Sequence, residues 1–188
     1  GGTPSTPAVL LKLDDLVGAA ARKNAAGVSP KWERVTRFRE ENKIPASYGI
    51  IGESLEPTNE AYFAWLKERS TAGLIEFWNH GYRFRFTPNP ARGEKGEFNG
   101  TTAEAQAQSI GRTQKLAKER IGVALRGFGP HSSAVDASTF TQLDGFPEIR
   151  YAWFYGPVDQ ATHQATVVKR PTELEVPIFH PNFDAFLK

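Results

Sequence analysis

The chain contains no cysteine and no long apolar run, and both absences limit what it can do. Without cysteine, neither a disulfide nor thiolate chemistry is available. No stretch approaches the roughly 20 apolar residues that a membrane-spanning helix requires, so we expect no membrane span. The net charge is only +2, and Lys and Arg are spread among Asp and Glu without a basic run. This charge pattern argues against a nucleic-acid partner.

The 188 residues are enough for one domain with a sizeable core. The opening GGTPSTP is small, polar and Pro-containing, and we interpret residues 1–7 as a flexible leader, either a tag remnant or the end left by signal-peptide removal. The domain is expected over residues 8–188. The chain stops in NFDAFLK, which has the pattern of a helix's first turns, so we expect its C-terminal end to be truncated.

Short apolar segments alternate with amphipathic ones along most of the chain. Strands are expected at residues 8–13, 46–52, 74–80, 123–129 and 149–156, with two later candidates at 165–170 and 175–181. Helices are expected at residues 29–43, 58–73, 101–122 and 136–143, with caps at Ser29, at Thr101 or Thr102, and at Asp136. This alternation predicts a parallel sheet or barrel with the helices outside.

Polar side chains follow several of these strands. Asp14 and Asp15 come after the first, His80 ends the third, the Arg126–His131 region follows the fourth, and His180 lies in the last. In parallel α/β folds this rim is where chemistry is assembled. Two adjacent carboxylates repel each other, so either a metal or Arg cation stands beside them or both are solvated at a strand end.

Four segments in this order resemble the polysaccharide deacetylase family: LLKLDDL, IEFWNHGY, RGFGPHSSAVD and PIFHPN. The resemblance extends from about Val9 to Asn182 and includes the intervening NKIPASYGIIG. It implies an incomplete (β/α) barrel of about seven parallel strands. It also implies a secreted or periplasmic enzyme that removes acetyl groups from a polysaccharide or oligosaccharide with the help of a divalent metal, zinc above all.

The resemblance also implies roles for individual residues. Asp14 would be the general base, and Asp15 and His80 would bind the metal, whose charge would explain the adjacent carboxylates. His180 would donate a proton to the leaving group.

Two features depart from the family pattern. The family has a second metal-binding histidine four residues after the first, and here that position is Phe84, which cannot be a ligand. Catalytic zinc sites usually keep three protein ligands, so the metal would be weakly held or absent unless His131, His163 or a loop carboxylate substitutes. The family often pairs its base with an arginine beside a proline. Here Arg126 is the nearest candidate for holding Asp14.

Further residues are candidates for substrate binding, by stacking on a sugar ring or by pairing with acidic groups: Trp78, Tyr82, Arg83, Arg85, Pro130, His131 and Trp153. For the tryptophans the alternative is a place in the core. Two other functions stay open beside the deacetylase. One is a degenerate, non-catalytic glycan-binding member, which Phe84 favours. The other is a metal-independent lyase or hydrolase that works through Asp14 and His180.

Overall fold

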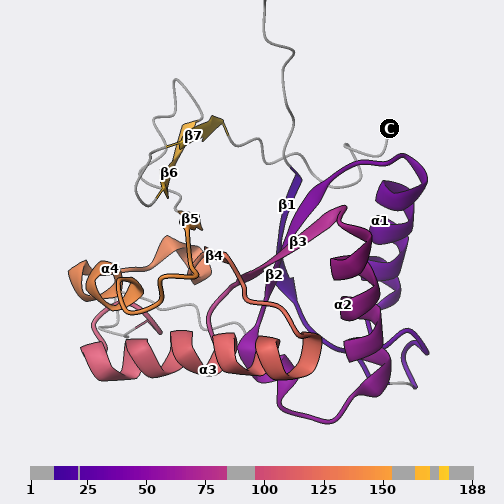
Figure 1. Ribbon diagram of the computed structural model, residues 1–188, viewed down its shortest axis with the longest axis horizontal. Coiled ribbons are helices and arrows are strands. Elements are labelled where there is room, and N and C mark those ends of the chain that lie inside the picture. The colour runs from indigo at the N-terminus through magenta and orange to yellow at the C-terminus, as the bar shows by residue number, and fades with distance from the viewer. Residues whose placement is uncertain (1–10, 21, 84–95, 154–163, 170–173, 178–188) are drawn as a thin grey trace, which may run out of the picture.

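The computed structural model describes residues 11–20, 22–83, 96–153, 164–169 and 174–177. In these residues one sheet holds seven strands in chain order (Figure 1). They are β1 (Leu11–Leu16), β2 (Ala46–Ile50), β3 (Ile75–Asn79), β4 (Gly127–Phe128), β5 (Tyr151–Trp153), β6 (Gln164–Lys169) and β7 (Leu174–Pro177).

Strands β1 to β5 pair in parallel, which confirms the expected incomplete (β/α) barrel. The direction then changes: β6 runs antiparallel to β5, and β7 antiparallel to β6. The expectation of parallel strands throughout is therefore corrected at this end of the sheet. Only four residues separate β6 from β7, which is too short for the crossover connection that a parallel pair needs. The first strand continues to Leu16, beyond its expected end at Leu13, so both carboxylates of the acidic pair belong to it.

The helices begin at the expected caps. The α1 helix (Pro30–Glu41) starts after Ser29, whose hydroxyl accepts from the Trp32 N–H. The α3 helix (Ala103–Ile121) starts after Thr102 rather than Thr101. The remaining helices are α2 (Glu60–Ala72), capped by Asn59, and α4 (Ala137–Leu143), capped by Asp136, with short 3-10 turns η1 (Gly52–Leu55) and η3 (His131–Ser133). No helix in the described part of the chain is long and apolar enough to cross a membrane.

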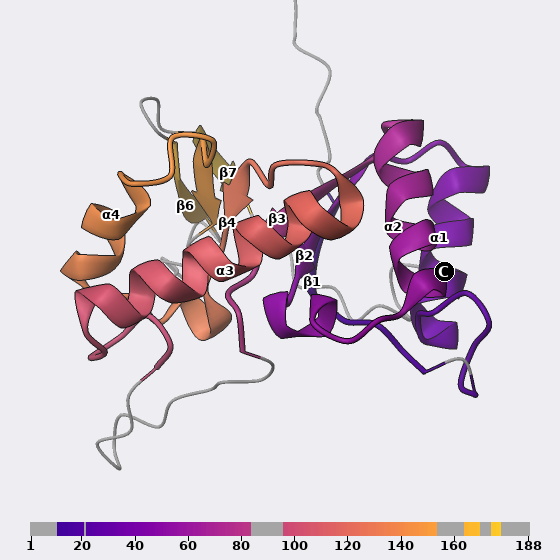
Figure 2. The same cartoon turned by 60° about the horizontal axis from the view of Figure 1, so that its bottom comes forward.

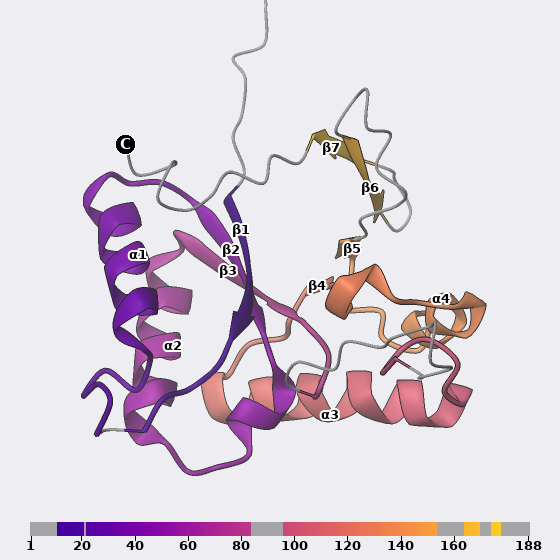
Figure 3. The same ribbon diagram turned by 180° about the vertical axis from the view of Figure 1, so that it is seen from behind.

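Two apolar clusters hold these elements together. The larger lies between α1, α2, the C-terminal part of α3 and strands β1 to β3, and includes Tyr48, Leu66 and Phe77. Figures 1 and 3 show α1 and α2 side by side along these strands, and Figure 2 shows α3 between that pair and α4. The smaller cluster, with Ile110 and Phe128, packs α3 and α4 against β4 and β5.

The other face of the strands carries the polar residues. Strand register places Leu13, Tyr48 and Phe77 in one row, which packs under the helices. Side chains alternate along a strand, so Lys12, Asp14 and Trp78 project from the opposite, concave face. The Trp78 ring lies across the backbone of β2 and of the segment after β4, where a Cβ at Gly49 or Gly129 would come within 2.7 Å of it. Glycine at these two positions is what lets the ring lie there.

Candidate metal centre

Asp15 reaches the site through an unusual backbone conformation. Alternation along β1 would direct Asp15 toward the helices, away from Asp14. Its φ is instead +64°, in the left-handed region that few non-glycine residues adopt. The pairing register of β1 with β2 shifts at the same place, between Leu13 and Leu16. Together these distortions turn the Asp15 carboxylate toward the ends of β3 and β4, and its side chain keeps half of its surface exposed.

His80 follows the last residue of β3 and is buried. Its Nδ1 lies 2.6 Å from the carbonyl oxygen of Gly129, the residue that directly follows β4. Its Nε2 lies 3.3 Å from Oδ1 of Asp15. A carbonyl oxygen only accepts, so Nδ1 carries the proton and the Nε2 lone pair faces the carboxylate when the ring is neutral.

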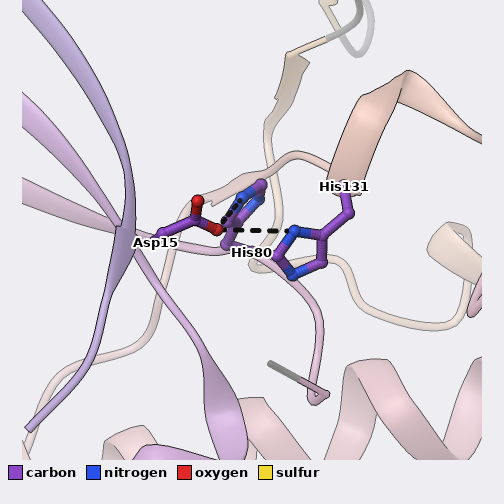
Figure 4. A group of neighbouring side chains, drawn as sticks. All are labelled: Asp15, His80 and His131. Carbon is purple, nitrogen blue, oxygen red and sulfur yellow. Dashed lines mark ion pairs between the residues drawn. The ribbon is translucent and has the colours of Figure 1, made fainter. Parts of the chain in front are cut away.

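His131 comes from the turn η3 and completes the group (Figure 4). Its Nε2 donates to the carbonyl of Arg83 at 3.1 Å, and its Nδ1 lies 3.4 Å from the same Asp15 oxygen. The ring centroids of His80 and His131 are 4.2 Å apart. The residue after His131, Ser132, has a φ of +53°, so this turn is also held in a sparsely populated conformation.

The three side chains fit a divalent cation. One ligand atom from each of Asp15, His80 and His131 lies within 4.8 Å of the others. Two imidazole lone pairs and a carboxylate oxygen converge, which is electrostatically unfavourable unless a cation or a proton lies between them. Each ring is oriented by a backbone carbonyl on its other nitrogen, as metal-binding histidines usually are. Two nitrogens and one oxygen form a donor set typical of catalytic zinc.

The charge state of His131 agrees with this interpretation. Burial of the ring, followed by the neighbouring His80, lowers the pKa of His131 below its usual range, although Asp15 and the Arg83 carbonyl oppose the change. A lowered pKa keeps the imidazole neutral at neutral pH, which is the form that can bind a metal.

Lys12 supplies the cation beside the first carboxylate. Its ammonium group hydrogen-bonds and ion-pairs with Asp14, two residues further along β1 on the same face. The amine also lies 4.7 Å from the ring centroid of Trp78 and 5.9 Å from that of Trp153. Burial lowers the pKa of Lys12, against the opposing effect of Asp14 and Asp15.

Arg126 does not take the place that sequence reasoning gave it. Its Nε pairs with Glu76 at 3.2 Å, and its side chain is 64% exposed. The expectation that Arg126 holds Asp14 is therefore corrected: Lys12 holds it, because residues two apart on a strand share a face. The i, i+2 spacing of Lys12 and Asp14 was the sequence signal that could have identified this pair.

The expected substrate-binding residues divide into three groups. Trp78 and Trp153 are 0% and 6% exposed and pack on each other, so neither offers a free ring face to a sugar, and the core alternative holds for both. Pro130 is buried where it leads into the η3 turn. Tyr82 and Arg83 line a cavity of about 850 Å³ beside α3, in which the Tyr82 hydroxyl donates to Glu56.

Several expected residues lie outside the described part of the chain. These are His180, Arg85, Phe84 and the alternative ligand His163. His131, by contrast, was expected both as a substrate-binding residue and as one of several substitute ligands. The structure places it beside Asp15 and His80.

No family model matches the chain, and no curated protein is significantly similar to it. Solved structures are similar in fold. One is a CE4 family pseudoenzyme from Bacillus anthracis, with 15% sequence identity, 77% of this chain and 42% of that chain covered, and a TM-score of 0.53. Another is a family 4 acetyl xylan esterase from Clostridium thermocellum in complex with a cobalt ion, with 15% identity, 72% and 54% covered, and a TM-score of 0.52.

A third is a deacetylase domain from Bordetella bronchiseptica, with 15% identity, 76% and 62% covered, and a TM-score of 0.52. The chain thus spans less than two thirds of the length of each of these structures. At such identities the likeness concerns the fold, and the chain has a polysaccharide deacetylase-like fold. Activity has to be argued from the site itself.

Proposed function

We propose that this chain is a metal-dependent hydrolase that removes acetyl groups from a polysaccharide or oligosaccharide. The observation that carries the proposal is the convergence of Asp15, His80 and His131, with both rings oriented by backbone carbonyls. The third ligand that Phe84 cannot provide would come from His131. A divalent metal bound there would polarise an acyl carbonyl and make an adjacent water more acidic.

The chain's own residues would divide the remaining work. Asp14 would accept a proton from the attacking water, since it stands next to a ligand and is one-third exposed. Lys12 would hold that carboxylate in place and offset the charge of the acidic pair. His180 is proposed as the proton donor to the leaving group, on the family resemblance. The half-exposed carboxylate of Asp15 leaves the site open to a substrate from the concave face.

The proposal extends to where the protein works. Acetylated polysaccharides such as chitin, peptidoglycan and xylan lie outside the cytoplasm, so we propose a secreted or periplasmic location. Fractionation of cells that produce the full-length protein would test this directly. Recovery in the cytoplasmic fraction alone would contradict it.

Metal binding is the decisive first test. Chelator-treated protein should bind zinc in calorimetry, and zinc at a hundred times its dissociation constant should stabilise the fold by about 2.7 kcal/mol. Asp15→Asn should weaken zinc binding by at least about a hundredfold, because loss of outer-shell partners alone costs up to that much. Asp144→Asn, an exposed position at the end of α4, is the matched control and should bind as the wild type does.

Activity is the second test. Zinc-loaded protein should release acetate from acetylated oligosaccharides, and Asp15→Asn should not. Protein without zinc affinity would contradict the proposed metal centre. Zinc binding and glycan binding without acetate release would favour the non-catalytic alternative.

A further inference from the structure

Glu97 is a buried carboxylate that is neither one of the proposed metal ligands nor the proposed base. It lies in the short segment before α3, and only 8% of its surface is exposed. Its Oε1 accepts hydrogen bonds from two consecutive backbone amides, Tyr82 N–H at 2.8 Å and Arg83 N–H at 3.1 Å. One carboxylate oxygen therefore organises the turn that follows His80.

The turn held by Glu97 reaches the second histidine of the metal centre. The carbonyl of Arg83 is the acceptor for Nε2 of His131 at 3.1 Å. Glu97 thus fixes the peptide on one side of Arg83, and the Arg83 carbonyl orients the His131 ring. A shift of that carbonyl would change which ring nitrogen carries the proton, and therefore which one can face Asp15.

The surrounding contacts show that the carboxylate is closely fitted to this turn. A Cβ at Gly81 would come within 2.5 Å of Oε2 of Glu97, and Gly81 itself has a φ of +81°. The backbone carbonyl of Glu97 in turn accepts from the Thr101 hydroxyl at 2.9 Å. Phe98, next in the chain, bridges to Val135 near the end of the segment that carries His131. The segment of Glu97 therefore contacts the chain on both sides of the metal centre.

We propose that Glu97 is a positioning residue of the metal centre, which fixes the Arg83 carbonyl and through it the ligand orientation of His131. The inference rests on the proposed function, since it presupposes that Asp15, His80 and His131 bind a metal. Glu97 does not touch the metal in this arrangement. Its effect is on how well His131 is prepared to bind.

The test compares zinc affinity of full-chain variants by calorimetry. Glu97→Ala removes the acceptor and should weaken zinc binding by about ten- to a hundredfold, the usual cost of losing an outer-shell partner. Glu97→Gln keeps an oxygen acceptor for both amides and should stay within about threefold of the wild type. Should Glu97→Ala fail to fold, Glu97→Asp retracts the carboxylate by one methylene and should show a smaller loss in the same direction.

Glu56→Ala provides the matched control. Its carboxylate accepts from the hydroxyl of Tyr82 and from Arg112, so it contacts the same turn through a side chain and not through the backbone. Its removal should leave zinc affinity unchanged. Equal losses in Glu56→Ala and Glu97→Ala would mean that general loosening of this region weakens binding, and the inference would be wrong.

A second readout follows the ring of His131 directly. In metal-free wild type, ¹⁵N chemical shifts of the histidine rings should show His131 protonated at Nε2, the nitrogen that faces Arg83. Glu97→Ala should give a mixture of the two tautomers, and Glu97→Gln should not. Wild type that binds no zinc would overturn the proposed metal centre. Wild-type zinc affinity and an unchanged tautomer in Glu97→Ala would overturn only the role of Glu97.

Discussion

Lys12 ion-pairs with Asp14 from the same face of the same strand, and the two residues form a cation–carboxylate pair beside the candidate metal centre of Asp15, His80 and His131. The ammonium group lies over two tryptophan rings, which limits its freedom to move. Adjacent carboxylates on β1 are thus accompanied by a buried cation of the chain itself. A bound metal would be the second.

We expect Lys12→Met to reduce turnover by about ten- to a hundredfold, because Asp14 would lose the partner that holds its carboxylate in position to accept the proton of the attacking water. Methionine fills a similar volume between the tryptophans, so the fold should persist. Steady-state kinetics with an acetylated oligosaccharide would measure the loss. Lys118→Met, at an exposed position of α3, serves as the control and should be silent. Unchanged turnover in Lys12→Met would separate Lys12 from the mechanism.

The base assignment leads to a second prediction. Asp14→Asn should lower deacetylation by on the order of a hundred- to ten-thousandfold, the usual contribution of a general base. Zinc affinity should change much less, since Asp14 is not among the three proposed ligands. Kinetics and calorimetry on the same preparation separate the two effects. A variant with near wild-type turnover would show that another group takes the proton.

His131 changes what is expected of Phe84. Phe84→His should alter zinc affinity by less than about threefold, because the three proposed ligands would already form a complete catalytic set. In the His131→Ala background, the same Phe84→His change should restore much of the lost affinity if its new imidazole reaches the ion. Calorimetry on the single and double variants forms a complete cycle. A large gain in the single variant would instead indicate that His131 does not ligate.

The cap of α4 gives a prediction about pH and stability. Burial opposes ionisation of Asp136, but the Gly100 N–H, the Gln106 amide and the Ser138 N–H donate to its carboxylate and lower its pKa from the ordinary 3.8. A carboxyl whose pKa is lower in the folded state stabilises the fold above its unfolded pKa. That stability is lost as the pH falls through the folded value.

Asp136→Asn keeps a capping oxygen but has no carboxylate to protonate. The free energy of unfolding measured in urea should therefore fall more between about pH 4 and pH 2 for wild type than for Asp136→Asn. Asp136→Ala should cost on the order of 1 kcal/mol already at neutral pH, because the cap itself is removed. Parallel pH profiles for wild type and Asp136→Asn would show that the lowered pKa of Asp136 does not stabilise the fold.

Much of the architecture could be predicted because it depends on local signals. The caps at Ser29 and Asp136 and the alternation of apolar strands with amphipathic helices are written in neighbouring residues. The antiparallel return of β6 and β7 depends on pairing between segments that carry no such signal. The Lys12–Asp14 pair could also be predicted from strand alternation, since residues i and i+2 of a strand project from the same face.

The complete ligand set could not be predicted in the same way. Alternation alone would turn Asp15 away from the site, and only its positive φ and the shifted register bring it back. His131 becomes a neighbour of His80 because β4 pairs directly with β3, and because the strained turn at Ser132 directs the ring inward. Both are tertiary features, and no spacing rule within one segment reports them.

The proposed ligands come from β1, the end of β3 and the turn after β4, so more than half of the 188-residue chain separates Asp15 from His131. During synthesis the binding site cannot exist until the segment containing His131 has emerged and β1 to β4 have assembled. Metal loading would then follow the folding of the sheet. Once bound, the ion would link β1 to the segments that follow β3 and β4. It would stabilise these strands against separation more than strands that contribute no ligand.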